Sequence, residues 1–386
     1  MYLYILTSTL YRLSCGALII AINWLMVINN SSLSWLASTV ALTFIPAMIV
    51  PLVWKKFGGE LSGKKLTQFG LFSAAILSLT MFMVQNQSLL LGLNTVLWLF
   101  FFIMESSWES WFASECNDLT DRDIERYSSI TMSANQAALM VGPVIVAYIF
   151  EHKPKLIILT CAVIYIFCFS VAFFANRQNV GAILNNNNNK SLSDKPQHLE
   201  ITGTELALLF IWPTLAMFNF MLPAQVASFN GSMAEVGLLD ALMGFGMIAS
   251  GFMVANTGLS KLVNRYKLNI LLLIVAALLW HFGSGLYERL LSVFILGLSF
   301  NCQRIIIRGE LAKKYKPDQV GKIVSIANAF SFILISTSLL FFYNNLSVNW
   351  MIPFIYSFVI GLLMSLKFNK TNTINDGEVK ESGYDY

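Results

Sequence analysis

Apolar stretches long enough to cross a bilayer recur along this chain, and they restrict its fold more than any other feature. A transmembrane helix needs about 20 consecutive, mostly apolar residues. We place twelve such spans, at residues 4–28, 34–54, 66–85, 89–112, 128–150, 156–176, 204–225, 235–257, 268–286, 289–308, 322–343 and 349–367. Only 12% of the residues are charged, whereas soluble proteins carry about 25%. The sequence therefore predicts an all-α, multi-pass membrane protein without a sizeable soluble domain.

Positive charges are sorted by the side of the membrane. Twenty Lys and Arg residues lie in or beside the connections after the even-numbered spans or in the C-terminal tail. The other connections hold three, namely Lys153, Lys155 and Arg289. Lys and Arg accumulate in cytoplasmic loops. We therefore expect both termini in the cytoplasm and the protein in the inner or plasma membrane of the cell.

A polar segment at residues 177–203 separates the first six spans from the last six. It contains a run of five asparagines at positions 185–189 and far fewer apolar residues than the spans, so it is predicted to be a flexible linker. The predicted organisation is a six-helix bundle, a cytoplasmic Asn-rich linker, a second six-helix bundle and a cytoplasmic tail, at residues 1–176, 177–203, 204–368 and 369–386. Two similar halves place a substrate site at their interface near the middle of the membrane.

Two short motifs are similar to those of one transporter family. The loop after the second span, Pro51 to Gly59, resembles the G-x-L-a-D-R-x-G-R-R loop of the major facilitator superfamily. Lys56 takes the place of the basic residue and Gly58 that of the glycine, whereas Lys55 stands where the family has an acid. Residues 262–267 form a fainter copy at the matching place in the second half.

The fifth span carries the second motif. Gly142 and Pro143 match the start of the G-P-x-x-G-G signature of exporters in that superfamily, but Val146 and Ala147 stand at the two later glycines. The Gly-Pro pair is either a hinge of the exporter type or incidental packing, because neighbouring helices satisfy a carbonyl freed by proline. The chain thus resembles a drug or siderophore exporter of the superfamily. The resemblance implies two pseudo-symmetric bundles with spans 1, 4, 7 and 10 lining a central cavity.

Charged residues inside the spans are the main candidates for function. Glu105 and Glu109 are four residues apart and therefore share one helix face. A charge deep in a bilayer costs roughly 2.5–3.5 kcal/mol, so these acids are predicted to face water, a base or a proton. At matched depth the tenth span carries Arg304 and Arg308, and the first span carries Arg12.

We hypothesise that the two acids pair with these bases across the halves and close the cytoplasmic side of the cavity. Glu105 is the predicted proton carrier. Glu109 and Arg308 also lie close enough to the interface to reach water by snorkelling. Asp240, near the outer side of the eighth span, is a second candidate for proton coupling. Five further polar or aromatic residues are candidates for substrate binding, although interhelical hydrogen bonding is the default role of the amides: Asn23, Trp24, Asn135, Gln136 and Asn219.

The predicted function is secondary active transport by alternating access, as a proton-coupled antiporter that exports a drug, a siderophore or an organic anion. Paired arginines favour an anionic group on the substrate. The phosphate-binding pattern GxxxxGK[ST] does not occur in the sequence, which argues against ATP as the driving force. The alternatives are an importer of a small anionic metabolite and a non-transporting membrane sensor or enzyme.

The expected partners are the small-molecule substrate, protons and membrane lipid. We expect a monomer without nucleic acid, cofactor or metal. The acidic segment from Asp118 to Glu125 is predicted to be a solvated loop, because its arginines and irregular spacing do not suit a cation site. The five cysteines are scattered, lack any CxxC pair, and are predicted to be free and buried.

Overall fold

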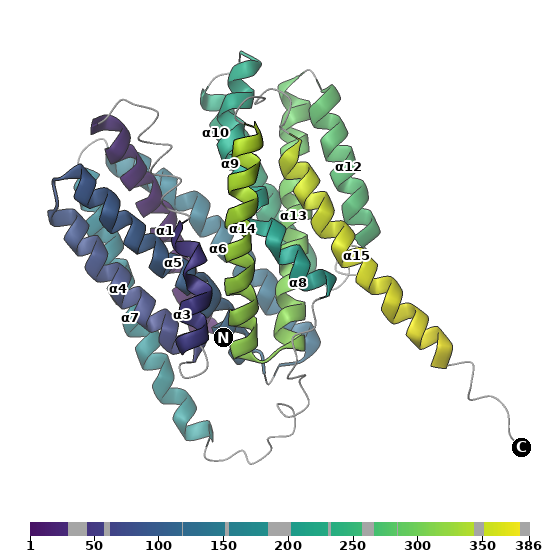
Figure 1. The fold of residues 1–386 in the computed structure, drawn as a ribbon, viewed down its shortest axis with the longest axis horizontal. Helices are drawn as coiled ribbons and strands as arrows, with labels where there is room; N and C mark the ends of the chain where they lie inside the picture. The colour runs from purple at the N-terminus through teal and green to yellow at the C-terminus, as the bar shows by residue number, and fades with distance from the viewer. Residues whose placement is uncertain are drawn as a thin grey trace, which may run out of the picture. The chain divides into compact units, whose positions relative to one another are not determined.

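The protein is helical throughout the part that the structure describes (Figure 1). The structure is a computed structural model, and it describes residues 1–29, 45–57, 62–117, 119–150, 154–183, 202–230, 233–256, 266–283, 285–342 and 351–378. Within these ranges six helices are long and apolar enough to cross a membrane. The predicted all-α, multi-pass class is therefore confirmed. The count of twelve spans stays a prediction, since most of the second span lies outside the described residues.

The helices group into two compact units. Unit 1 comprises Met1–Gln197 and Arg308–Ile333, and unit 2 comprises His198–Ile307 and Leu334–Tyr386. The units group residues that contact one another, whatever their position in the sequence. The segment 308–333 therefore belongs to unit 1, although it comes from the second predicted bundle. The predicted division into residues 1–176, 177–203, 204–368 and 369–386 stays a prediction, and most of the linker lies outside the described residues.

Unit 1 is built mainly from helices of the first half of the chain. They are α1 (Tyr2–Asn29), α3 (Val50–Phe57) with the preceding 3-10 turn η1 (Ile45–Met48), α4 (Gly63–Met83), α5 (Gln87–Glu115), α6 (Asp121–Phe150) and α7 (Pro154–Ile183). Helix α1 packs against α6 and α7, and α4 packs against α5 and α7. The last turns of α13 (Leu286–Lys314) and the greater part of α14 (Pro317–Phe342) complete the unit.

Helix starts in unit 1 follow from side chains that accept the first free N–H groups. Ser62 Oγ accepts from the N–H of Lys65 at the start of α4, at 3.4 Å. Asn86 Oδ1 accepts from the N–H of Ser88 at 2.9 Å at the start of α5. Pro154 and Pro317 are the first residues of α7 and α14, a position where proline loses no hydrogen bond.

The close contact between α1 and α6 depends on two glycines. A Cβ atom at Gly142 would lie 2.5 Å from the carbonyl oxygen of Leu13, and one at Gly16 would lie 2.9 Å from the carbonyl oxygen of Leu139. Both distances are too short for a real Cβ contact. Small residues at such contacts let two membrane helices approach backbone to backbone.

Unit 2 contains most of the second half of the chain. Its helices are α8 (Gly203–Ala207), the 3-10 turn η2 (Leu208–Phe210), α9 (Ile211–Ser228), α10 (Met233–Ala255), α12 (Tyr266–Phe282), α13 as far as Ile307, and α15 (Ile352–Glu378). Helix α15 packs against α9 and α12. Glycine contacts also join α10 to α13, where Cβ atoms at Gly246 and Gly297 would lie 2.2 Å and 2.1 Å from backbone oxygens of the partner helix.

Helix boundaries differ from the predicted ones at several polar ends. The acidic segment predicted as a loop is partly helical, because α6 begins at Asp121. Thr120 initiates it, accepting at Oγ1 from the N–H of Asp123 at 3.3 Å.

The predicted span 204–225 is interrupted by η2, just before Pro213. Proline has no N–H to donate to the carbonyl four residues earlier, so the α-helical pattern lapses there.

Candidate functional site

Two acids of α5, one helical turn apart, each form an ion pair within unit 1. Glu105 pairs with Arg12 of α1. Arg12 Nη2 donates to Glu105 Oε2 at 2.6 Å, and Arg12 Nη1 contacts Glu105 Oε1. The two side chains are 15% and 14% exposed. Two parallel contacts between a guanidinium and a carboxylate are stronger and more specific in geometry than one.

The second acid, Glu109, pairs with Arg308 of α13. Arg308 Nε donates to Glu109 Oε2 at 2.7 Å, and Arg308 Nη2 donates to the hydroxyl of Tyr4. The guanidinium carbon lies 3.9 Å from the centroid of the Phe112 ring, where a cation interacts favourably with the aromatic face. The side chain of Arg308 is 5% exposed. Residues of α1 and α5 therefore enclose this base, and it does not extend to solvent.

Aromatic side chains surround the second pair. The ring of Tyr4 packs edge to face against Trp108 and Trp111, with centroids 5.5 Å and 5.1 Å apart. The three side chains are at most 3% exposed, and the Tyr4 hydroxyl donates to the main-chain oxygen of Trp108 at 3.1 Å. A charge is screened poorly in such surroundings, so losing one partner would leave the other strongly destabilised.

Two further contacts hold the end of α13 and the start of α14 in unit 1. Lys313 Nζ donates to Glu125 Oε1 of α6 at 2.9 Å. Trp54 Nε1 of α3 donates to the main-chain oxygen of Asp318 at 3.1 Å. We refer to these two contacts and the ion pair of Arg308 as the α13–α14 clamp. The clamp joins helices of the first predicted bundle to helices of the second, and all of its residues belong to unit 1.

A glycine on α14 makes room for the indole of the clamp. A Cβ atom at Gly321 would lie 1.8 Å from Cζ2 of Trp54, and Trp54 is 3% exposed. The indole therefore lies directly on the backbone of α14. Any larger residue at position 321 would have to displace the ring.

The other charged candidates lie in unit 2. Arg304 is half-buried, and its guanidinium carbon lies 5.6 Å from the centroid of Phe300, one turn earlier on α13. Asp240 is exposed on α10. The predicted pairing of Arg304 with Glu105 stays a prediction because the two residues belong to different units. In unit 1, Glu105 already has Arg12 as its partner.

The polar substrate-binding candidates are spread over three helices. Asn135 Oδ1 on α6 accepts from Thr9 Oγ1 of α1 at 3.4 Å, an interhelical hydrogen bond of the kind expected by default. Gln136, also on α6, is half-buried, and Asn219 is exposed on α9. The side chains of Asn23 and Trp24 on α1 lie outside the described residues.

The motif residues take ordinary positions. Lys56 is exposed in the last turn of α3, with its ammonium 5.4 Å from the centroid of the Phe57 ring. Gly142 forms the α1–α6 contact described above, next to the residue that follows Arg12. Gly58 and the side chain of Pro143 lie outside the described residues. All five cysteines are buried and free, as predicted.

Sequence reasoning did not identify Tyr4, Trp54 or Gly321 as parts of the charged site. Tyr4 and Trp54 lie near the predicted ends of spans, where aromatic residues are common in any membrane protein. Their partners lie 304 and 264 positions away along the chain. No local pattern signals such distant contacts.

Comparison with known proteins places the chain in a family. The sequence pattern of the Major Facilitator Superfamily matches residues 4–339. No curated protein matches the chain. The fold is similar to that of the human organic anion transporter MFSD10 (TETRAN), with a TM-score of 0.71 at 13% identity over 95% of this chain and 98% of that one. It is also similar to a bacterial homologue of the iron transporter ferroportin in its outward-facing state, with a TM-score of 0.68 at 16% identity over 96% and 99% of the two chains.

At these identities the similar structures establish the fold alone, whereas the family match covers most of the sequence. The family and the fold together indicate a multi-pass membrane transporter of small molecules rather than an enzyme. The chain therefore belongs to the Major Facilitator Superfamily.

Proposed function

We propose that this transporter exports a small organic anion across the cell membrane in exchange for protons, by alternating access. The observation that carries the proposal is the pair of ion pairs on one face of α5. One acid, Glu105, is held by a base of α1. The other, Glu109, is held by a base of α13. We assign the ion pair of Glu105 to proton coupling and the ion pair of Glu109 to the gate.

The Arg12–Glu105 pair is the proposed coupling element. Both side chains are largely removed from solvent, so a proton on Glu105 would leave Arg12 as a buried charge without its counter-ion. Breaking a buried pair in this way costs about 3–5 kcal/mol. A cost of this size is enough to shift an equilibrium between two conformations more than a hundredfold. Proton binding would therefore favour a rearrangement of α1 against α5.

The α13–α14 clamp is the proposed gate. By the predicted topology its residues lie on the cytoplasmic side, at the ends of α3, α5 and α13 and the starts of α6 and α14. While the clamp holds, helices from the two predicted bundles are fastened together there. Opening towards the cytoplasm would require Arg308 to leave Glu109, Tyr4 and Phe112.

An anionic substrate is proposed because Arg308 would lose its carboxylate partner, Glu109, when the gate opens. A guanidinium that has lost a carboxylate is best satisfied by another carboxylate or a phosphate, which match its planar donors. Arg304, one turn away on α13, is a second base for the same anion. One of the similar structures is of an organic anion transporter, but at 13% identity the proposal rests on the arginines of this chain.

The export direction rests on the Gly142-Pro143 motif. Gly142 brings α6 against the carbonyl of Leu13, the residue after Arg12. A hinge at this point would move the base of the coupling pair together with α6. We therefore propose the exporter-type role for Gly142 because its packing contact with α1 adjoins Arg12 of the coupling pair.

Transport in vesicles tests the proposal. Purified protein is reconstituted, a pH gradient is imposed, and the movement of carboxyfluorescein, an organic anion, is compared with that of ethidium, a cation. We expect pH-driven movement of the anion, and loss of this movement in Glu105→Gln. Glu288→Gln, which makes the same change at an exposed acid in the first turn of α13, is the matched control and should transport normally. If the pH gradient moved ethidium but not carboxyfluorescein, the proposed anionic substrate would be contradicted. Full activity of Glu105→Gln would contradict the coupling role of Glu105. Movement of the anion in the same direction as the protons, instead of in the opposite direction, would favour an importer.

A further inference from the structure

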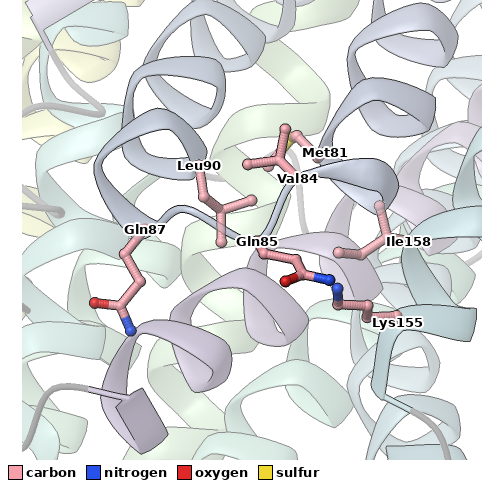
Figure 2. A pocket seen from close by; sticks show the side chains of 7 residues that line it. All are labelled: Met81, Val84, Gln85, Gln87, Leu90, Lys155 and Ile158. Carbon is pink, nitrogen blue, oxygen red and sulfur yellow. The ribbon is translucent and has the colours of Figure 1, made fainter.

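A cavity of about 230 Å³ opens in unit 1, away from the charged site. It lies where α4 ends and where α5 and α7 begin. Seven residues line it: Met81, Val84, Gln85, Gln87, Leu90, Lys155 and Ile158 (Figure 2). By the predicted topology this end of the unit faces the outer side of the membrane, opposite to the end that carries the α13–α14 clamp.

The lining has an apolar floor and a polar rim. Met81, Leu90 and Ile158 form the floor and are 1%, 8% and 1% exposed. Gln85 and Lys155 are exposed on the rim. Figure 2 shows the amide of Gln85 and the ammonium of Lys155 pointing toward one another, with Gln87 on another side of the cavity. The rim thus gathers N–H donors above apolar carbon.

The charge of the rim selects an anion. Lys155 is the one charged residue of the lining, and no acid among the described residues lies within 4.0 Å of its ammonium. Lys155 is also in the first turn of α7, where the helix dipole favours negative charge. A phosphate group offers several acceptor oxygens to an ammonium and two amides at once.

The neighbours of the rim are suited to acyl chains. Met83, Leu89 and Leu156 come from the same three helix ends and are 79%, 53% and 44% exposed. In a multi-pass membrane protein such exposed apolar side chains contact lipid. A molecule that places a phosphate at Lys155 and hydrocarbon against these residues has the chemistry of a phospholipid.

We propose that this cavity is a binding site for an anionic phospholipid, with the phosphate held by Lys155, Gln85 and Gln87 and the acyl chains lying against Met83, Leu89 and Leu156. On the predicted topology the lipid belongs to the outer leaflet. The site does not depend on the proposed transport reaction. It joins the ends of α4, α5 and α7, so an occupied site would hold these three helices together.

Lipid binding to the intact protein in detergent tests the proposal. Native mass spectrometry would measure the affinity for phosphatidylglycerol and for phosphatidylcholine. We expect phosphatidylglycerol to bind more tightly than phosphatidylcholine. Lys155→Gln should weaken phosphatidylglycerol binding about tenfold, or about 1.4 kcal/mol, because it removes a charge-assisted hydrogen bond to the phosphate. Lys155→Arg should restore binding. Leu90→Trp, which fills the cavity without changing its charge, should also weaken it.

Lys65→Gln, which removes an exposed lysine from the other end of α4, is the charge-matched control and should keep this affinity. Equal affinity for the two lipids, or wild-type affinity in Lys155→Gln, would overturn the proposal. Glycerol phosphate distinguishes a lipid from a soluble ester. Glycerol phosphate should displace phosphatidylglycerol poorly. If it displaced the lipid at the same concentration at which the lipid itself binds, the site would be assigned to a soluble phosphate compound instead.

Discussion

Arg308 Nε donates to Glu109 Oε2 at 2.7 Å and so joins two residues that lie 199 positions apart in the chain. The base is 5% exposed and the acid 23% exposed. Each member of the pair therefore relies on the other for much of its stabilisation. This relationship predicts different outcomes for single and double substitutions.

Replacing Arg308 alone should destabilise the protein more than replacing both partners. Arg308→Gln leaves Glu109 beside buried aromatic rings without its base, a loss of about 3 kcal/mol. In the double variant with Glu109→Gln, both charges are gone, and part of the loss should be recovered. The midpoint of unfolding by dodecyl sulfate in mixed micelles measures this. Arg122→Gln, at an exposed position of α6, should behave as wild type. Strictly additive effects of the two substitutions would mean that the pair is not coupled.

The α3–α14 contact predicts that one small substitution loosens the start of α14. In Gly321→Ala the added methyl group would lie 1.8 Å from Cζ2 of Trp54, so the indole must move away from the carbonyl of Asp318. We expect faster amide hydrogen exchange in the first turns of α14, by about tenfold or more for a cost of at least 1.4 kcal/mol.

Gly309→Ala is the matched control for this change. A Cβ atom at Gly309 would meet nothing within 4 Å, and alanine is the better helix former. Exchange in α14 should therefore be unchanged in Gly309→Ala. Equal exchange in the two alanine variants would show that the contact between Trp54 and Gly321 does not hold α14.

Spans were predictable from the sequence because hydropathy is a local property. The expected span 66–85 corresponds to α4 at Gly63–Met83, and 268–286 corresponds to α12 at Tyr266–Phe282. The polar helix ends were not predictable in this way. Helix α6 begins at Asp121 although its first turns are hydrophilic, because a helix outside the apolar layer can still be started by a capping side chain and continued by its own hydrogen bonds.

The charged site was predictable only in part. A charge inside an apolar span is costly, so the sequence indicated that Glu105 and Glu109 would face water, a base or a proton, and it suggested Arg12, Arg304 and Arg308 as the bases. Which base each one meets depends on the packing of helices distant in sequence. Arg12 follows Tyr11, a fully buried residue of α1, and its position opposite Glu105 is set by how α1 lies on α5. Periodicity within one helix carries no information on that.

The glycine contact between α1 and α6 predicts that Gly142→Ala is harmful although the substitution is small. The added methyl group would lie 2.5 Å from the carbonyl oxygen of Leu13, a backbone atom that moves only with its helix. Overpacking of this kind costs about 1–3 kcal/mol. Gly92→Ala, where a Cβ atom meets nothing within 4 Å, should be neutral or slightly stabilising. Dodecyl sulfate unfolding of the two variants gives the comparison, and a stable Gly142→Ala would contradict the close approach of α1 and α6.

The outermost contact of the α13–α14 clamp should contribute the least. Lys313 and Glu125 are 26% and 41% exposed, and ion pairs with this access to solvent are worth about 0.2–1 kcal/mol. Glu125→Gln should therefore lower the unfolding midpoint only slightly, and less at 1 M salt, where the Debye length is about 3 Å. The loss in Arg308→Gln should persist at high salt because that pair is shielded by Tyr4 and Phe112. If both losses vanished at high salt, the two contacts would be equally exposed, and the stability of the clamp could not be assigned to its buried pair.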